Sequence, residues 1–346
     1  MKALKQLILA GLLFSTGGLF QSCDKFRFPT DPMAASPSSA PTPATPVPTT
    51  VVLPLTQYVA QWGTQGSGNG QFTAPTGVAV DPQGNVYVAD FSNNRVEKFD
   101  PSGAFLYQWG TWGSGNGEFK NPYWVAVGTN GNVYVTDFGN RRVQKFHDNG
   151  TSVTYVHPMG GAQDYTFGMP LGIAEDNNGN VYVADGGYNQ IVKFDSNGTL
   201  KFAWGTQGSG NGAFFTPFDV AVNAAGDLYV SDSGNNLIQK FAVNNTQATF
   251  VAQWGGYGTT GGKLFSPRGL ALDAGGNLYV ADTGNNRVQV FDPSGTFLVA
   301  LGNTAGGTGN GQFSSPQGVA LASTSLLYVA DLGNTRIQKF GLSPTP

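Results

Sequence analysis

Short apolar runs separated by turn-forming residues recur along most of the chain. In the first clear unit, the apolar run at 77–80 precedes an Asp-x-x-Gly-Asn turn signal at 81–85, and further runs follow at 86–89, 95–99 and 105–109. Runs of this length that end in glycine, asparagine or aspartate are typical of β-strands joined by tight turns. The pattern therefore predicts units of four antiparallel strands.

The same unit occurs six times. The tetrapeptide Tyr-Val-(Ala/Thr/Ser)-Asp begins at positions 87, 134, 182, 229, 279 and 328, so the period is 47 to 50 residues. A strand-rich period of about 40–50 residues is typical of one propeller blade per repeat. A fourth-strand pattern also precedes the first unit at 58–63, whereas the last unit ends near Gly341 after three strands. We therefore expect an all-β, six-bladed β-propeller with four antiparallel strands per blade, in which the N-terminal strand completes the last blade.

The repeated unit resembles a known family. Its sequence, Pro-x-Gly-Val-Ala-Val-Asp followed by Gly-Asn-Val-Tyr-Val-Ala-Asp-x-x-Asn-Asn-Arg-Val-x-Lys-Phe, is similar to the NHL repeat over about residues 57–341. The resemblance implies a six-bladed propeller. WD40 and kelch repeats fit less well, because the Gly-His and Trp-Asp signature and the double-glycine strand are missing. Propellers host many functions, so the function must be argued from the site.

Composition and charge narrow the classes of function. Glycine accounts for 50 of the 346 residues, charged residues for only 11% and aromatic residues for 12%. A disordered chain would be charged and poor in aromatics, and long helices would not tolerate so much glycine. The net charge of −3 gives no basic surface for nucleic acid. With one cysteine and two histidines, we expect no metal, no cofactor and no enzyme activity.

The N-terminal residues predict export and a lipid anchor. Lys2 and Lys5 precede an apolar stretch at 7–20, which is too short to span a bilayer comfortably. Cys23, the only cysteine, follows directly, and residues 19–23 resemble the lipobox of a bacterial lipoprotein precursor. The resemblance implies lipidation of Cys23 and a place in the bacterial cell envelope. The alternative is an ordinary secreted protein with a stray cysteine.

Three parts of the chain follow from these patterns. Residues 1–22 are the expected signal peptide, residues 23–55 the anchor cysteine with a Pro-, Ser- and Thr-rich tether, and residues 56–342 the propeller. A run rich in proline and poor in charge cannot bury a core and is typical of an extended linker. We expect a monomer that contacts the membrane through its lipid only.

Residues found in every unit are expected to build the blades. The tetrapeptide aspartates are followed five positions later by arginine in four units, as in the pair Asp282 and Arg287. One interpretation is a ring of ligand-binding charges. The other, which we favour, is a hydrogen-bonded pair that braces the turn between the second and third strands.

Enzymatic relatives suggest a second hypothesis. An amidating lyase similar to NHL proteins binds its metal through several histidines. Here we expect His147 just after a third strand and His157 in the fourth, outermost strand of the same blade, both away from the central channel. Lactonases of six blades use carboxylates and an asparagine on their inner strands as metal ligands. In this chain, Glu175 and Asp219 are the ionisable residues on inner strands that differ from the residue usual at their repeat position. The alternative function is therefore an envelope lyase or hydrolase with a weak metal site in the channel.

The favoured hypothesis is a binding or scaffold module for a protein, peptide or glycan. Its candidate site consists of residues that break the repeat at loop ends on one face. An aromatic cluster at such positions is typical of a binding patch, although it can also fill the mouth of the channel. The predicted ligand-binding residues are Phe91, Tyr123, Trp124, Phe138, Phe218, Asp219 and Arg268.

Overall fold

The computed structural model describes residues 55–160, 165–322 and 326–342. All of them belong to one compact unit, Val52–Pro346. The expected signal peptide, Cys23 and almost the whole tether lie outside the described residues. Within the described ranges, no helix is long and apolar enough to cross a membrane.

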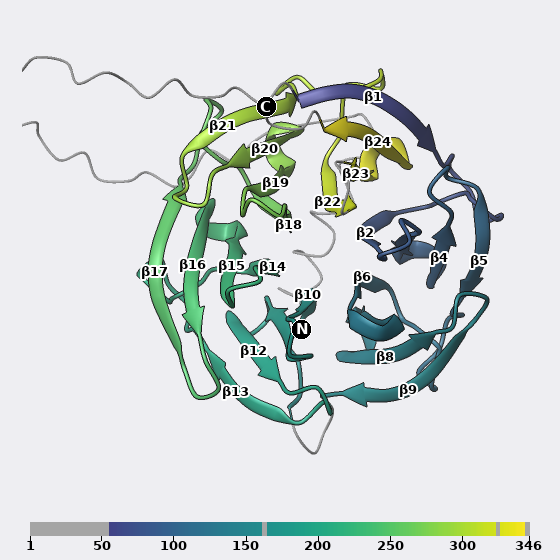
Figure 1. Cartoon of the computed structure of the whole chain (residues 1–346), viewed down its shortest axis with the longest axis horizontal. Coiled ribbons are helices and arrows are strands. Elements are labelled where there is room, and N and C mark those ends of the chain that lie inside the picture. Colours follow the sequence, from purple (N-terminus) through teal and green to yellow (C-terminus); the bar gives the residue numbers. More distant parts are fainter. Residues whose placement is uncertain (1–54, 161–164, 323–325, 343–346) are drawn as a thin grey trace, which may run out of the picture. The chain divides into compact units, whose positions relative to one another are not determined.

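The described strands form six four-stranded antiparallel sheets, which surround a common centre as the blades of a propeller (Figure 1). Blade 1 contains β2 (Pro75–Val80), β3 (Val86–Asp90), β4 (Arg95–Phe99) and β5 (Phe105–Trp109). Blade 2 contains β6 (Pro122–Val127), β7 (Asn132–Asp137), β8 (Arg142–Asp148) and β9 (Val153–Met159). Blade 3 contains β10 (Pro170–Glu175), β11 (Val181–Asp185), β12 (Gln190–Phe194) and β13 (Leu200–Trp204).

The second half of the ring repeats this plan. Blade 4 contains β14 (Pro217–Val222), β15 (Asp227–Asp232), β16 (Leu237–Val243) and β17 (Ala248–Gly255). Blade 5 contains β18 (Pro267–Leu272), β19 (Leu278–Asp282), β20 (Arg287–Phe291) and β21 (Phe297–Gly302). Blade 6 contains β22 (Pro316–Ala322), β23 (Leu326–Asp331), β24 (Arg336–Leu342) and β1 (Leu55–Trp62). The predicted all-β, six-bladed fold is confirmed.

The N-terminal strand closes the ring as predicted. The last sheet has the order β1-β24-β23-β22, and β1 pairs antiparallel with β24 through Tyr58 opposite Phe340 and Trp62 opposite Ile337. The ring of Trp62 lies 6.0 Å from that of Tyr328 in its own blade and 5.8 Å from that of Phe99 in blade 1. One tryptophan therefore joins the first and last blades.

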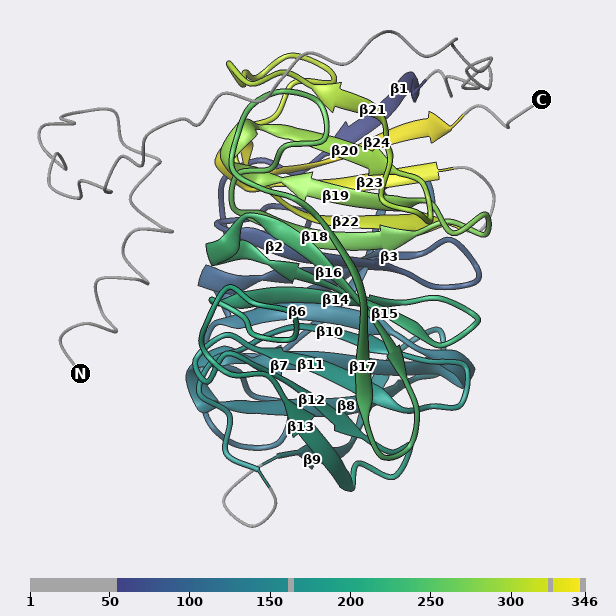
Figure 2. The ribbon, with the colours of Figure 1, turned by 90° about the vertical axis from the view of Figure 1, so that its left-hand side faces the viewer.

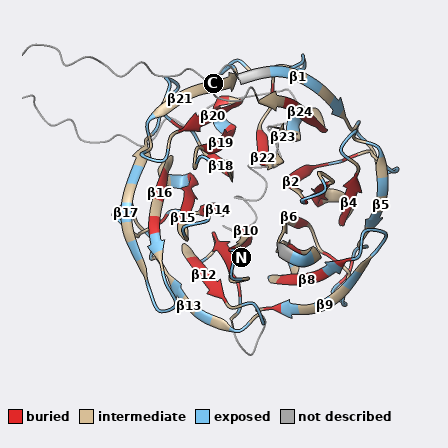
Figure 3. Cartoon of the chain, viewed as in Figure 1, coloured by how far each residue is buried: buried red, intermediate tan, exposed pale blue. Residues whose placement is uncertain are grey.

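The core lies between neighbouring blades. The tyrosine of each second strand is at most 2% exposed. In four blades, a tryptophan of the fourth strand lies outward from it and packs against the next blade. Trp109 repeats the arrangement of Trp62, with its ring 6.3 Å from Tyr87 and 5.9 Å from Phe146 of blade 2. Figure 3 shows the burial concentrated on the inner strands, with exposure on the outer ones. Aromatic pairs of this kind contribute about 0.5–1.5 kcal/mol each beyond their buried area.

The inner strands approach one another closely around the centre. A Cβ atom on Gly77 would lie 2.7 Å from the Cα of Trp124, and one on Gly172 would lie 2.5 Å from the Cα of Asp219. Only glycine fits at such distances. Blades 2 and 4 can therefore carry a side chain at this position because the preceding blade carries glycine.

The two faces of the ring differ, and Figure 2 shows the strands running from one face to the other. We call loop face the side with the turns between second and third strands and the crossings between blades, and hairpin face the opposite side. Five of the loop-face turns are short 3-10 helices: η2 (Phe91–Asn93), η4 (Phe138–Asn140), η5 (Ser233–Asn235), η6 (Thr283–Asn285) and η7 (Leu332–Asn334). A further one, η3 (Thr129–Gly131), lies on the hairpin face between β6 and β7.

Candidate functional site

The five repeat-breaking aromatics lie together on the loop-face end of the channel. We call them the mouth cluster. Tyr123 is central, with its ring 5.4 Å from Phe91, 5.8 Å from Phe138 and 5.5 Å from Phe218. The ring of Trp124 meets that of Phe218 edge-on at 5.9 Å. The inner strands β6 and β14 and the turns η2 and η4 thus bring together residues that are far apart in the sequence.

Most of the mouth cluster is buried. Phe91, Trp124 and Phe218 are 7%, 4% and 5% exposed, while Tyr123 and Phe138 are half-buried. This burial fits the alternative in which the cluster fills the channel mouth, whereas ligand binding by these residues stays a prediction. Their neighbours in the next blade cover them, so they fill the mouth of the channel.

Arg268 lies over the mouth cluster from the opposite side of the channel. Its guanidinium lies 4.7 Å above the centre of the Phe218 ring, and its Nη1 donates to the Tyr123 hydroxyl at 3.3 Å and to Gln317 Oε1. Tyr123 belongs to blade 2 and Arg268 to blade 5, on opposite sides of the ring. A hydrogen bond between them therefore spans the channel and closes it at the loop face.

Asp219 is buried beneath the mouth cluster with only 1% exposure. Its Oδ2 accepts a hydrogen bond from the Leu270 N–H at 2.8 Å, and its own N–H donates to Ser231 Oγ at 2.8 Å. Oδ1 has no hydrogen-bond partner among the described residues. Burial raises the pKa of Asp219 well above its ordinary value, although the Leu270 and Val220 N–H groups oppose the shift.

Glu175 lies at the other end of the inner strands. It accepts hydrogen bonds from the Tyr134 hydroxyl at 2.7 Å and from Asn132 Nδ2 at 3.3 Å. It is the last residue of β10, whereas Asp219 is the third residue of β14, so the two are offset by roughly 10 Å along the strand direction. The described part of the chain contains no group of three or more His, Cys, Asp or Glu residues that could hold a metal ion. The structure does not bring Glu175 and Asp219 together as a cation site.

The channel itself holds a cavity of about 230 Å³. Trp124, Asp219 and Glu175 line it, together with small apolar side chains from all six inner strands. His147 and His157 lie on the outer strands β8 and β9 and do not reach it. His147 is thus inside a strand, not beyond its end as the sequence suggested, but both histidines are away from the channel as expected.

The Asp–Arg pair is present in four blades, and each pair lies within its own blade. Asp282 Oδ2 accepts from Arg287 Nε at 2.7 Å, and its Oδ1 accepts from the Phe265 N–H at 2.7 Å. Arg287 Nη2 donates to the carbonyl oxygens of Thr260 and Lys263 in the preceding crossing. The pair thus ties the turn between the second and third strands to the crossing that leads into the blade.

A second set of aromatics, which sequence reasoning missed, is exposed on the loop face. Trp112 and Tyr257 lie in the crossings between blades and are each 71% exposed. Lys120 Nζ lies 5.3 Å from the Trp112 ring, and the rings of Tyr257 and Phe265 meet edge-on at 5.3 Å. The other exposed aromatics of this face are Tyr188 and Phe215.

The sequence held a signal for these residues. Trp112 and Tyr257 make the same bridge to the end of their crossing that Gln65 and Gln207 make in other blades. Trp112 and Tyr257 therefore break the repeat within the crossings, where two other blades have glutamine.

The comparison with known families gives one match. The NHL repeat model matches five segments, which lie in blades 1, 2, 4, 5 and 6: residues 72–99, 119–146, 216–241, 266–291 and 313–340. Blade 3 has Gln190 where four other blades have arginine, and its loop-face turn at 186–189 is not a 3-10 helix. The unmatched blade is therefore also the one with a different turn.

Relatives of known name match the chain over about one repeat. They are lin-41 of Caenorhabditis elegans (48% identity over 48 residues), the E3 ubiquitin-protein ligase TRIM71 of Rattus norvegicus (47% over 47) and brain tumor of Drosophila melanogaster (44% over 50). Each match covers 14% of this chain and between 4% and 6% of the relative. The similarity is therefore to a repeat within much longer proteins.

Solved structures match over most of the chain. An auxiliary nutrient binding protein of Bacteroides thetaiotaomicron is 14% identical with a TM-score of 0.59, covering 82% of this chain and 72% of that one. A gluconolactonase of Xanthomonas campestris is 16% identical with a TM-score of 0.57 (80% and 88% covered), and virginiamycin B lyase of Staphylococcus aureus is 14% identical with a TM-score of 0.55 (79% and 96% covered). At these identities the likeness shows the fold.

Two of these structures are enzymes, which corrects one expectation. The sequence led us to expect no enzyme activity, but a gluconolactonase and a lyase share the fold. The fold is therefore compatible with enzymes. With its five matching repeats and its ring of six sheets, the chain is an NHL-repeat protein that folds as a six-bladed β-propeller.

Proposed function

We propose that the propeller is a binding module that holds a protein, peptide or glycan on its loop face. The observation that carries this proposal is the exposure of large aromatic side chains there, above all of Trp112 and Tyr257, at 71% each. Exposed tryptophan and tyrosine are enriched at interfaces, because each offers a large contact area together with a polar group.

The repeat supports a role beyond folding for these two side chains. Glutamine takes the same position in other crossings, at Gln65 and Gln207, so the blade does not need an aromatic residue there. Among the proteins with a similar repeat or fold, one is named a ubiquitin-protein ligase and one a nutrient binding protein. Both names fit a propeller that presents a recognition surface.

The experiment replaces both aromatics with the residue that other blades use. The full chain with Trp112→Gln and Tyr257→Gln should keep its melting temperature and lose at least about tenfold in affinity for a partner captured from host envelope extract, since a central aromatic contributes about 2 kcal/mol or more. Leu106→Gln and Val251→Gln, on the exposed outer strands β5 and β17, form the control pair. Equal capture by both pairs and wild type overturns the assignment of the loop face.

We also propose that Cys23 is lipidated and holds the protein in the bacterial cell envelope. The support is its place directly after an apolar stretch and before a proline-rich tether. In a bacterial host, Cys23→Ala should move the protein from the membrane fraction to the soluble one. Wild type that takes up no labelled fatty acid, together with a variant that stays with the membrane, contradicts the anchor.

A further inference from the structure

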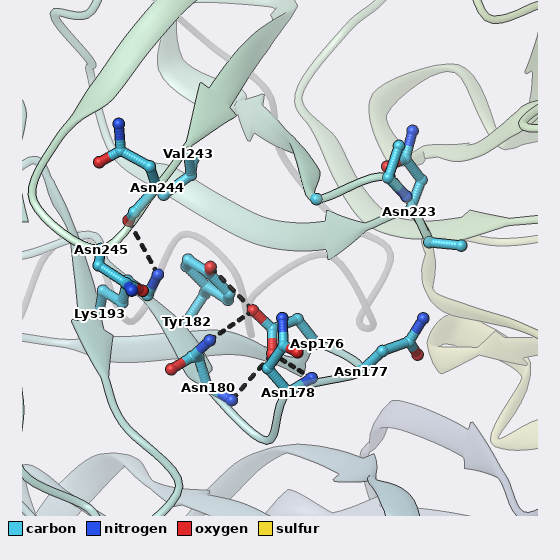
Figure 4. A pocket seen from close by; sticks show the side chains of 13 residues that line it. Asp176, Asn177, Asn178, Asn180, Tyr182, Lys193, Asn223, Val243, Asn244 and Asn245 are labelled. Carbon is cyan, nitrogen blue, oxygen red and sulfur yellow. Dashed lines mark hydrogen bonds between the residues drawn. The ribbon is translucent and has the colours of Figure 1, made fainter.

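A polar pocket opens on the hairpin face between blades 3 and 4 (Figure 4). Its volume is about 250 Å³. The turn at 176–180 after β10, the turn at 223–226 after β14 and the turn at 243–245 after β16 form its walls, and Lys193 of β12 and Tyr182 of β11 form its floor. It lies at the opposite end of the strands from the loop face, so it is separate from the surface proposed above.

Lys193 is buried in this pocket without a carboxylate beside it. The residue is 2% exposed, its Nζ donates to the Asn244 carbonyl at 2.9 Å, and it lies 5.2 Å from the centre of the Tyr182 ring. Among the described residues, no carboxylate oxygen lies within the 4.0 Å of an ion pair. Burial lowers the pKa of Lys193, and the charge of Asp176 opposes the shift. A buried cation of this kind is stabilised when an anion reaches it.

The chain contains a matched pocket in which the charge is already balanced. Between blades 1 and 2, a cavity of about 440 Å³ has Lys98 in the place of Lys193. Lys98 Nζ lies 2.9 Å from Asp148 Oδ2 and 3.6 Å from Asp81 Oδ2. Asp148, the last residue of β8, reaches it from the neighbouring blade.

One of the differences between the two pockets decides how the lysine charge is balanced. Asp148 stands three positions after Lys145, and Val243 stands three positions after Lys240 at the same place in the repeat. Val243 lines the pocket of Lys193. Lys98 therefore has a second carboxylate at a position where the pocket of Lys193 has an apolar side chain. The Lys193 ammonium group can still bind a negatively charged ligand.

Asp176 does not take that role. Its Oδ1 accepts hydrogen bonds from the N–H groups of Asn178 and Asn180, both at 2.9 Å. Its Oδ2 accepts from Asn180 Nδ2 at 2.8 Å and from the Tyr182 hydroxyl at 3.1 Å. Figure 4 shows these bonds holding the carboxylate against the turn. Asp176 braces its own turn, as Asp81 does in the matched pocket, but it forms no ion pair with Lys193 within 4.0 Å.

The rest of the wall is rich in amides. Asn177, Asn244 and Asn245 line the pocket beside Lys193. An asparagine amide both donates and accepts, so a group of them suits hydroxyl groups, which do the same. The small volume suits a ligand of about one sugar ring, since pockets for drug-sized molecules measure about 300–1,000 Å³. The single ammonium group of Lys193 suits a ligand with one negative charge.

We propose that this pocket binds a hydroxylated monocarboxylate of the sugar-acid class, with the carboxylate on Lys193 and the hydroxyl groups on the asparagine amides. The charged hydrogen bond from the ammonium group supplies most of the affinity, because such bonds are about twice as strong as neutral ones. The amides supply the preference for a polyol over a simple carboxylic acid.

The test titrates D-glucuronate into the purified full chain and follows binding by saturation-transfer NMR and calorimetry. We expect saturable binding with a Kd in the range of about 0.1–10 mM, typical of a few polar contacts. D-glucose, which lacks the carboxylate, and acetate, which lacks the hydroxyl groups, should each bind at least about tenfold more weakly. Glucose binding equally well overturns the role of Lys193, and acetate binding equally well overturns that of the amides.

Two variants locate the site. Val243→Asp introduces the carboxylate that the matched pocket has and should abolish glucuronate binding with the fold intact, because the new side chain satisfies Lys193. Lys193→Met should also abolish binding. It is the second variant because it removes the buried hydrogen bond to the Asn244 carbonyl as well. No saturable binding to wild type, or unchanged binding to Val243→Asp, overturns the proposal. Neither result bears on the loop-face variants, so the two proposals fail separately.

Discussion

At the scale of single residues, position 97 shows how one departure from the repeat changes a blade. The third residue of the third strand is glutamine in four blades, and Gln144 donates to Asp137 Oδ2 at 3.1 Å while accepting from the Gly117 N–H at 2.9 Å. Blade 1 has Glu97 instead, which accepts from the Gly70 N–H and leaves Oε2 without a partner among the described residues. Burial raises the pKa of Glu97 to about 7, against the opposing charge of Arg95.

We expect Glu97→Gln to stabilise the protein at pH 8. The variant carries the residue that four other blades use, and it removes a buried carboxylate that lies near Asp90 and lacks one hydrogen bond. The gain should be about 1–3 kcal/mol, the cost of an unsatisfied buried polar group. Urea denaturation of wild type and variant at pH 5 and pH 8 measures it.

The pH dependence has a defined sign. The unfolded carboxyl loses its proton near its ordinary pKa of 4.5, whereas the folded one keeps it up to about pH 7. Because the folded state binds more protons in this window, the stability of wild type relative to the variant falls as the pH rises from 4.5 to 7. A difference between the two proteins that stays constant over this window contradicts the assignment to Glu97.

Trp124 tests whether the mouth cluster fills the channel. Trp124→Gly should cost about 3–5 kcal/mol of the free energy of unfolding, because a buried aromatic is removed and a cavity remains. Glycine is the residue of four other blades at this position, so the backbone tolerates it. Leu106→Ala, at a site 43% exposed, should change stability by no more than about 0.5 kcal/mol. Similar unfolding curves for both variants would place Trp124 on the surface.

The sequence predicted which aromatics gather on one face but not their exposure. The repeat identified Trp124 and Phe218 as departures at the same end of the inner strands, and they are neighbours. Their burial depends on Arg268 reaching across the ring to Tyr123, a contact between residues 145 positions apart. A repeat aligns positions within blades and contains no information on how six different side chains meet at the centre.

At the scale of the element, the loop-face turn depends on its aspartate. Asp282 is fully buried and accepts from Arg287, from Asn285 Nδ2 and from the Phe265 N–H. Blades 3 and 4 have no arginine at this position. In blade 3 the Tyr165 hydroxyl donates to Asp185 Oδ2 at 3.1 Å instead, alongside the N–H groups of Gly168 and Met169. The aspartate is thus common to all six turns, whereas its partners vary.

Asp282→Ala should therefore destabilise the protein by about 1–3 kcal/mol, because it leaves buried donors without an acceptor. Asp292→Ala is the matched control, since Asp292 makes the same kind of turn contacts, to the Ser294 and Thr296 N–H groups, at an exposed site. Thermal and urea unfolding of both variants measure the difference. A loss for Asp292→Ala as large as for Asp282→Ala would show that the turn contacts, and not their burial, matter.

At the scale of the whole molecule, counting strands predicted the ring and the way it closes. The decisive residues were Tyr58 to Gly63, which repeat the fourth-strand pattern ahead of the first unit. Such a count works because every blade solves the same packing problem. It could not predict the pocket of Lys193, because that site depends on Val243 of the next blade and appears only when neighbouring blades are placed side by side.

The closure of the ring gives the last prediction. Deleting residues 55–62 removes β1, exposes the edge of β24 and takes Trp62 from between Tyr328 and Phe99. Losing the tryptophan alone should cost about 3–5 kcal/mol, so the deletion should lower the melting temperature by many degrees and promote association through the open edge. Trp62→Ala separates the two effects, because it keeps the strand pairing and should cost only the part due to the side chain. An equally long deletion at 35–42, outside the described residues, is the control. If both deletions melt like wild type, β1 does not close the ring, and the stability of the propeller comes from the other blades alone.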